Sequence, residues 1–230
     1  MAPLTNDTPK VMLEVAGRPF IDHQLHQIKA QGGHKVVLAL GHLGSAVEEH
    51  VRDGRQFGLE VAYSYDGPVL LGTGGALRQA TRQLDGPFFV LYGDSYLQLD
   101  WPDVQSTYQR SGRDGLMTVF KNNGRWDTSN VAFAEGEILL YRKGIRNDAS
   151  GDPAIEYIDY GLQILTRDAL ERHQGEGAFD LAALLSRMVA EKRMAGYLAR
   201  QRFYEIGSRA GLVELDEVLT RKPEAPEHRS

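Results

Sequence analysis

The stretch LEVAYSYDGPVLLGTGGALRQATRQL (residues 59–84) decides the fold class of this chain. Its first seven residues (59–65) alternate between apolar and polar side chains in the manner of a β-strand. A glycine-rich segment (72–75) then leads into ALRQATRQL (76–84), which has the composition of a helix. A strand followed by a short loop and a helix is the repeating unit of α/β proteins.

Similar strand and helix patterns lie on both sides of this stretch. KVVLAL (35–40) and PFFVLYGD (87–94) are short apolar runs, and the second is nearly continuous, as expected of a strand covered on both faces. The helices predicted in this half are residues 18–31, 45–53 and 101–110. Ser45 and Glu48 have the spacing of a capping box at the start of the second helix. The alternation predicts a mostly parallel, Rossmann-like α/β sheet with helices on both faces.

The pattern changes between residues 115 and 165. Four strand-like segments follow one another there, separated by turn residues: GLMTVF (115–120), NVAFAE (130–135), EILLYRK (137–143) and AIEYIDYGLQIL (154–165). Strands without helices between them predict a β-rich part within the α/β fold.

The last part of the chain returns to helices and short strands. Leu181, Leu184, Leu185, Met188 and Val189 recur at helical spacing on one face. Further predicted elements are the strands AGYLA (195–199) and RFYEIG (202–207) and a helix at 209–220. We expect a single domain over residues 1–220, with parts 1–114, 115–165 and 166–220, followed by a disordered polar tail at 221–230.

Composition excludes several kinds of site and favours one compartment. The 230 residues contain no cysteine, which excludes disulfides, thiolate metal sites and a cysteine nucleophile and favours a reducing, cytoplasmic location. The net charge of -5 argues against broad nucleic-acid binding. No apolar run approaches the ~20 residues of a membrane span, so we expect no membrane partner.

The residues that follow each strand are the candidate ligand-binding residues, because ligands of such sheets bind beyond the carboxyl ends of the strands. Gly72, Gly74 and Gly75 would let a ligand approach the backbone, and the following helix would offer unpaired N–H groups. Leu77 stands where a dinucleotide-binding fingerprint needs its third glycine, and no phosphate-loop lysine follows. A flexible turn between strand and helix is the alternative.

Four charged residues are further candidates. Asp94 follows PFFVLYG and could bind Mg²⁺ through oxygen, or it could cap the next turn. Glu205 lies in the apolar run FYEI, so it is paired or metal-bound unless it faces water from a strand edge. Lys10, in a proline-flanked loop, and Lys143, at the end of EILLYRK, could each bind phosphate or be solvated.

The order of these segments resembles that of the sugar-1-phosphate nucleotidyltransferases. The segments span nearly the whole of residues 1–220 and read TNDTPKVMLEVAGRPFIDHQL, LLGTGGAL, VLYGDSYL, YRKG, YIDYGL and FYEIG. They look most like the bacterial branch that activates heptose, hexose or N-acetylmuramic acid 1-phosphates. The resemblance implies the nucleotide-diphospho-sugar transferase fold with a β-rich sugar-binding insertion. It also implies an Mg²⁺-dependent reaction of a nucleoside triphosphate with a sugar 1-phosphate, giving a nucleotide-sugar and pyrophosphate.

The resemblance implies roles for the residues on the nucleotide side. Lys10 matches a catalytic lysine that binds phosphate in the transition state, although Val11 replaces the proline expected after it. Asp94 matches a catalytic acid that binds Mg²⁺, and Glu205 occupies the place of a second metal-binding aspartate. The segment that matches the base-recognition loop consists of Gly72, Thr73, Gly74 and Gly75.

The resemblance also implies contacts to the sugar phosphate. Lys143 matches a lysine that contacts this group, although Arg142 and Gly144 depart from the usual motif on both sides. Asp159 falls where the family has an asparagine that touches the sugar, and Asn130 is a further candidate for sugar contact.

Members of this family begin with an apolar strand and a G-G-x-G-T-R-L loop, and neither is found in this sequence. We therefore expect an N-terminally shortened chain whose sheet lacks its first strand and whose activity is severely reduced. A non-catalytic protein that binds nucleotide-sugars, or regulates, is the second interpretation. A nicotinamide oxidoreductase is disfavoured by the glycine spacing. The base, the sugar and the oligomeric state stay open.

Overall fold

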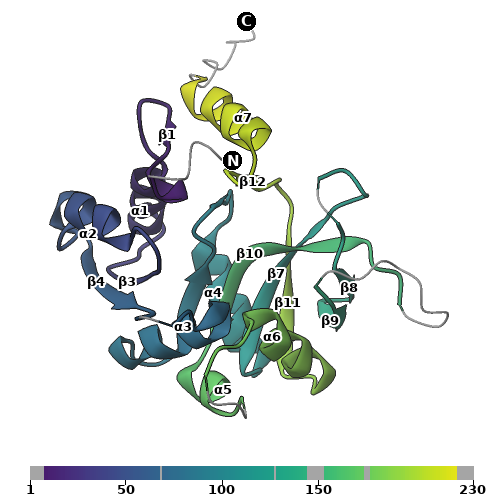
Figure 1. Cartoon of the computed structure of the whole chain (residues 1–230). Coiled ribbons are helices and arrows are strands. Elements are labelled where there is room, and N and C mark those ends of the chain that lie inside the picture. Colours follow the sequence, from purple (N-terminus) through teal and green to yellow (C-terminus); the bar gives the residue numbers. More distant parts are fainter. Residues whose placement is uncertain (1–7, 68, 127, 144–152, 174–176, 222–230) are drawn as a thin grey trace, which may run out of the picture.

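The computed structural model describes residues 8–67, 69–126, 128–143, 153–173 and 177–221 (Figure 1). Its helices are α1 (Phe20–Ala30), α2 (Gly44–Val51), α3 (Gly72–Ala80), α4 (Trp101–Ser111), α5 (Arg167–Glu171), α6 (Leu181–Ala190) and α7 (Arg209–Thr220), with 3₁₀ turns η1 (Lys10–Met12), η2 (Arg55–Phe57) and η3 (Thr81–Gln83). Its strands are β1 (Glu14–Val15), β2 (Arg18–Pro19), β3 (Lys35–Leu40), β4 (Glu60–Tyr65), β5 (Phe88–Leu91), β6 (Ser95–Tyr96), β7 (Gly115–Lys121), β8 (Val131–Ala134), β9 (Glu137–Tyr141), β10 (Tyr157–Leu165), β11 (Met194–Ala199) and β12 (Tyr204–Glu205).

The largest sheet has six strands in the order β5-β10-β7-β11-β9-β8. β11 runs parallel to β7, whereas β10 runs antiparallel to both β5 and β7. The sheet is therefore mixed, whereas the alternation of strands and helices in the sequence predicted mostly parallel pairing. The reason is connectivity: β7, β8, β9 and β10 follow one another without a crossover helix, and neighbouring parallel strands need such a crossover.

β3 and β4 form a second sheet, which is parallel as predicted. All six residues of each strand are in register, from Lys35 opposite Glu60 to Leu40 opposite Tyr65. The crossover between them contains α2 and η2. Among the described strands, β3 pairs only with β4 and β5 pairs only with β10, so each of these two strands has one edge without a partner strand.

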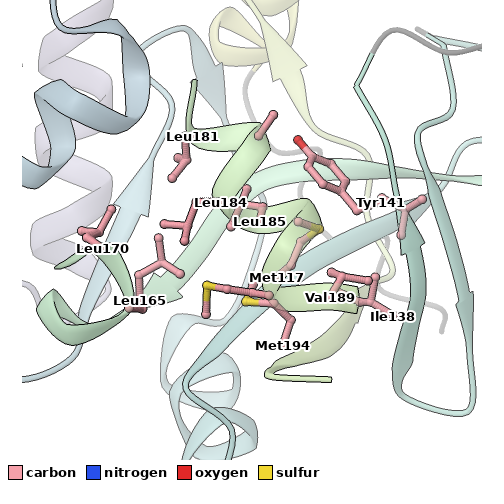
Figure 2. Packing of buried hydrophobic residues seen from close by; sticks show 14 of the residues in the cluster. Met117, Ile138, Tyr141, Leu165, Leu170, Leu181, Leu184, Leu185, Val189 and Met194 are labelled. Carbon is pink, nitrogen blue, oxygen red and sulfur yellow. The ribbon is translucent and has the colours of Figure 1, made fainter. Parts of the chain in front are cut away.

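Helices cover both faces of the large sheet, as the sequence predicted. The apolar side of α6 packs on Met117 of β7, Leu165 of β10 and Met194 of β11 (Figure 2). On the other face, Trp101 and Val104 of α4 belong to apolar clusters that contain residues of β7 and β10. The helical spacing of leucines in residues 181–189 is therefore confirmed as the core-facing side of α6.

A separate apolar cluster joins the two ends of the chain. Val15 and Phe20, from the N-terminal hairpin and α1, pack with Ile206 and with Leu215 of α7. Figure 1 shows α7 and β12 beside the hairpin that contains β1. This cluster joins the hairpin that follows η1, which contains Lys10, to Tyr204 of β12, the neighbour of Glu205.

Two local predictions are wrong. α2 begins at Gly44 after Leu43 in the left-handed conformation, and no side chain caps it, so Ser45 and Glu48 form no capping box. Glu48 instead accepts a hydrogen bond from the Tyr65 hydroxyl of β4, because the tertiary contact brings that donor within reach. α3 begins at Gly72, so the glycine-rich segment is the first turn of the helix and not a loop before it.

Three further points compare the structure with the sequence-based predictions. α5, with Thr166 as its N-cap, was not predicted. Residues 222–230 of the predicted tail lie outside the described residues. In the part of the chain that the structure describes, no helix combines the length and apolarity that crossing a bilayer requires.

Candidate functional site

Lys10 and Asp94, 84 positions apart in the sequence, form an ion pair. Lys10 Nζ lies 3.1 Å from Asp94 Oδ2, and the two side chains keep 36% and 39% of their surface exposed. Lys10 is in η1, and Asp94 is in the turn between β5 and β6. A half-exposed pair of opposite charges can exchange its partners for an ionic ligand, so both groups are available for binding.

Three backbone carbonyl groups hold the turn around Asp94. The buried side chain of Gln24 on α1 donates to the carbonyl oxygens of Tyr92 (3.0 Å) and Ser95 (2.9 Å). The backbone N–H of Ile206 donates to the carbonyl oxygen of Asp94 at 2.9 Å. Each such bond contributes about 1 kcal/mol, and together they fix the backbone from which the Asp94 carboxylate projects.

Glu205 is brought to the same turn by strand pairing. β12 pairs antiparallel with β6, and Glu205 lies opposite Ser95, the neighbour of Asp94. Glu205 is exposed, which agrees with the alternative in which this acid lies at a strand edge. β12 is only two residues long and pairs with one short strand, so much of the surface of Glu205 stays exposed.

The acids of this turn have the oxygen chemistry that Mg²⁺ prefers. Among the described residues, no group of three or more His, Cys, Asp or Glu side chains is placed to hold a metal. Mg²⁺ is usually bound through one or two carboxylates, with waters and substrate phosphates completing its shell. Asp94, directly before β6, and Glu205, on the paired strand β12, fit that pattern.

Phe179 makes the closest approaches to the glycines of α3. A Cβ atom on Gly72, where φ is +68°, would lie 2.6 Å from the Phe179 carbonyl oxygen, and one on Gly74 would lie 2.2 Å from its ring. The Gly74 N–H donates to that oxygen at 2.9 Å. Packing against Phe179 therefore requires these glycines. The sequence had suggested a different reason for them, namely the close approach of a ligand.

We expect Gly74→Ala to lower the unfolding temperature by about 2–10 °C, because overpacking costs about 1–3 kcal/mol in a protein of this size. The new methyl group would meet the Phe179 ring. Thermal unfolding followed by circular dichroism measures the effect. Gly41→Ala is the matched control, since nothing lies within 4 Å of its added Cβ. Equal unfolding temperatures for the two variants would contradict the packing explanation.

Lys143 pairs with Asp180, the N-cap residue of α6, with Nζ 2.9 Å from Oδ2. The same carboxylate accepts a hydrogen bond from the Thr73 hydroxyl. The structure thus links Lys143 to the glycine-rich turn of α3 through a residue that the sequence did not single out.

Asp159 is half-buried, and its carboxylate is saturated by internal donors. It accepts hydrogen bonds from the Tyr92 hydroxyl (2.9 Å), the Gln163 amide (2.8 Å) and the Gly161 N–H (3.0 Å). Its own N–H donates to Asn130 Oδ1 at 2.9 Å. Burial raises the pKa of Asp159 above its usual value, and hydrogen bonds from these three donors and from Tyr141 only partly oppose that change.

The family assignment comes from a sequence comparison. Residues 1–129 match the sequence model of the nucleotidyl transferase family. The chain belongs to the nucleotidyl transferase family. That match covers more than half of the 230 residues.

Two relatives of this nucleotidyl transferase are N-acetylmuramate alpha-1-phosphate uridylyltransferases. The one from Neisseria meningitidis is 38% identical over 102 residues, which is 44% of each chain. The one from Caulobacter vibrioides is 27% identical over 221 residues, covering 90% of this chain and 86% of the relative. The chain spans less than half the length of the first curated relatives that it matches, with 44%, 31% and 34% covered.

A solved structure with a similar fold is HddC from Yersinia pseudotuberculosis complexed with GMP-PN. Its TM-score is 0.74 at 18% sequence identity, and the match covers 95% of this chain and 93% of that chain. The similarity confirms the predicted fold of the nucleotidyl transferase as a mixed α/β fold of the nucleotide-diphospho-sugar transferase type.

The sequence did not single out three residues of the candidate site: Gln24, Tyr92 and Asp180. Asp180 had a signal, because an aspartate directly before an apolar helix is a typical N-cap. Tyr92 directly precedes Gly93-Asp94, but nothing local shows that its hydroxyl reaches Asp159. Gln24 had no signal, since its role depends on carbonyl groups about 70 residues away.

The raised pKa of Asp159 predicts how stability depends on pH. The folded chain binds this proton more tightly than the unfolded chain, whose aspartate titrates near pH 4, so Asp159 disfavours folding increasingly as pH rises above ~4. We expect the unfolding temperature of Asp159→Asn, relative to the wild type, to rise between pH 4 and pH 8. Asp85→Asn, at an exposed position, should show no such trend. A difference that stays constant over this range would contradict the prediction.

Proposed function

We propose that this chain transfers a nucleotidyl group from a nucleoside triphosphate to a sugar 1-phosphate, releasing pyrophosphate. The observation that carries the proposal is the Lys10–Asp94 pair with Glu205 on the adjacent strand, within a member of the nucleotidyl transferase family. The relatives from Neisseria meningitidis and Caulobacter vibrioides are named for such a reaction with N-acetylmuramate 1-phosphate. The complex of HddC with GMP-PN supports a nucleotide site in this fold.

The reaction needs positioning and charge neutralisation more than proton transfer. An oxygen of the sugar phosphate attacks the α-phosphorus of the triphosphate in line, and the bond from that phosphorus to the β-phosphate oxygen breaks. The attacking phosphate is already ionised, so no general base is required. The Lys10 ammonium at ~4 Å from a phosphate would interact by about 4 kcal/mol per charge pair at an effective dielectric constant of ~20.

Asp94 and Glu205 are the residues that would hold Mg²⁺. When bound, the ion would offset the repulsion between the two anionic substrates. Asp94 also forms the ion pair with the Lys10 ammonium, so this ammonium and the bound ion would lie close to each other. We assign the first turn of α3, from Gly72 to Gly75, as the segment that faces the nucleotide; it includes Thr73.

Lys143 and Asn130 are assigned to the sugar-phosphate side. Lys143 carries its ammonium at an exposed position, where a phosphate can reach it. The Asp159 carboxylate accepts hydrogen bonds from Tyr92, Gln163 and Gly161. We therefore assign Asp159 to holding the backbone on the sugar-phosphate side in place. We propose that residues 1–220 form a single domain that carries all of these residues. We also propose that the protein acts in the cytoplasm, where nucleoside triphosphates are abundant.

A nucleotide-sugar-binding protein without turnover is the second candidate. The exposed Glu205, which is one methylene longer than the aspartate that the resemblance implies, favours it. Pyrophosphate release and calorimetric binding of a nucleotide-sugar distinguish the two functions, since binding alone would be seen without turnover.

The test is a matrix of four nucleoside triphosphates against several sugar 1-phosphates, with pyrophosphate release as the readout in the presence of MgCl₂. N-acetylmuramic acid, glucose, mannose and heptose 1-phosphates form the sugar set. We expect release with at least one pair and loss of release with EDTA. No release with any pair, from a chain shown to be folded, would overturn the proposal.

A further inference from the structure

The Asp180 carboxylate joins two segments that the proposed function assigns to different substrates. Its Oδ2 accepts a hydrogen bond from Lys143 Nζ at 2.9 Å, and its Oδ1 accepts one from the Thr73 hydroxyl at 3.0 Å. Lys143 follows β9 in the β-rich part, whereas Thr73 lies in the first turn of α3. One side chain therefore connects the sugar-phosphate side to the nucleotide side.

The first turns of α3 and α6 are tied to each other by backbone groups around Asp180. The Leu181 N–H donates to the Thr73 hydroxyl at 2.9 Å, and the Ala182 N–H donates to Asp180 Oδ1 at 3.0 Å. The Gly74 N–H donates to the carbonyl oxygen of Phe179 at 2.9 Å. Asp180 is thus held by a rigid frame, so the carboxylate sets the position of the flexible lysine and not the reverse.

Lys143 is held in a way that leaves it able to bind a ligand. The side chains of Lys143 and Asp180 are 61% and 50% exposed, and exposed ion pairs contribute little to stability. The hydrogen bond from Lys143 lowers the pKa of the Asp180 carboxyl, so this carboxyl is ionised at neutral pH. A lysine ammonium has three N–H donors, and the bond to Asp180 uses one of them.

We infer that Asp180 is a positioning residue that sets Lys143 at a fixed distance from the first turn of α3, so that the sugar phosphate and the nucleotide bind in register. The inference rests on the proposed function. In-line transfer requires the reacting atoms to lie about 3–3.5 Å apart, so loss of register reduces the rate and does not unfold the protein. Asp180 acts through Lys143 and contacts neither substrate.

The first test is Asp180→Asn, which keeps a side-chain oxygen for Ala182 and Thr73 but removes the charge that holds Lys143. We expect kcat/KM for the sugar 1-phosphate to fall about tenfold, with KM for the nucleoside triphosphate within about twofold of the wild type. The unfolding temperature should stay within about 2 °C. Asp100→Asn is the matched control, because Asp100 is the N-cap of α4 and its carboxylate accepts a hydrogen bond from the Asp103 N–H. This substitution should leave all these values unchanged.

The second test repeats the substitution in a Lys143→Ala background. If Asp180 acts through Lys143, Asp180→Asn changes kcat/KM no further there. A tenfold loss in both backgrounds would show that Asp180 serves only the start of α6, and this would overturn the inference. So would a value for Asp180→Asn within about twofold of the wild type, since coupled groups differ by more.

Failure of the proposed function gives a different result. In that case the wild-type chain releases no pyrophosphate with any substrate pair. The wild type, Asp180→Asn, Lys143→Ala and the double variant are then titrated with glucose 1-phosphate by calorimetry. Weaker binding by Asp180→Asn in the wild-type background, but not with Lys143→Ala, supports the inference without turnover, and equal binding by all four proteins overturns it.

Discussion

Asp94→Asn is expected to release pyrophosphate at least about 100-fold more slowly than the wild type. A bound metal ion supplies several kcal/mol of stabilisation to the reacting phosphates, and each 1.36 kcal/mol corresponds to about a factor of ten in rate. Asparagine keeps the size of the side chain but removes the charge that faces Lys10 and would hold Mg²⁺. Initial rates over a range of MgCl₂ concentrations measure the effect.

The control for Asp94→Asn is Asp85→Asn, at an exposed position before β5, whereas Asp94 follows that strand. Its rate should equal that of the wild type. The backbone of the Asp94 turn is held by Gln24 and Ile206 independently of the carboxylate, so the variant should keep its fold. A folded Asp94→Asn variant that keeps more than a fifth of the wild-type rate would exclude Asp94 from the proposed chemistry.

Leu185→Ala is expected to destabilise the chain by about 2–5 kcal/mol and to lower its unfolding temperature by about 5–15 °C. Leu185 has no exposed surface and lies in the cluster between α6 and the large sheet (Figure 2). Removing its side chain leaves a cavity that close-packed neighbours cannot fill. Urea titration and thermal unfolding give the two quantities.

Leu139→Ala is the matched control, because Leu139 on β9 is 51% exposed. The same three side-chain carbons are lost there from a largely solvated position, so the expected loss of stability is below about 1 kcal/mol. Similar losses at positions 139 and 185 would mean that α6 is not packed on the sheet as described.

Most of the elements could be predicted because their signals are local. The apolar stripe of α6 and the short runs that become β3 and β11 depend on periodicity within one element. The mixed order of the large sheet could not be predicted in the same way. The direction of β10 depends on which strands it pairs with, and those partners lie up to about 75 residues earlier in the chain.

For the candidate site, too, the sequence predicted some features and the tertiary structure decided others. The sequence assigned Lys10 and Asp94 to the nucleotide side, and in the structure they form an ion pair. The sequence also assigned Glu205 to the same metal as Asp94, and it left open whether Glu205 is buried or lies at a strand edge. The structure decides this point, because the two-residue strand β12 leaves Glu205 exposed. The carboxylate of Asp159, expected to touch a sugar, is instead occupied by internal donors.

The sequence by itself determined the α/β elements, the acid and lysine at their ends, and the family. Periodicity and residue type act over a few neighbours, so one strand or turn suffices to read them. Only the tertiary structure decided that Phe179 fills the space beside the glycines, and that Asp180 links Thr73 to Lys143. These contacts join residues between 37 and 107 positions apart, and packing of the whole core sets their distance.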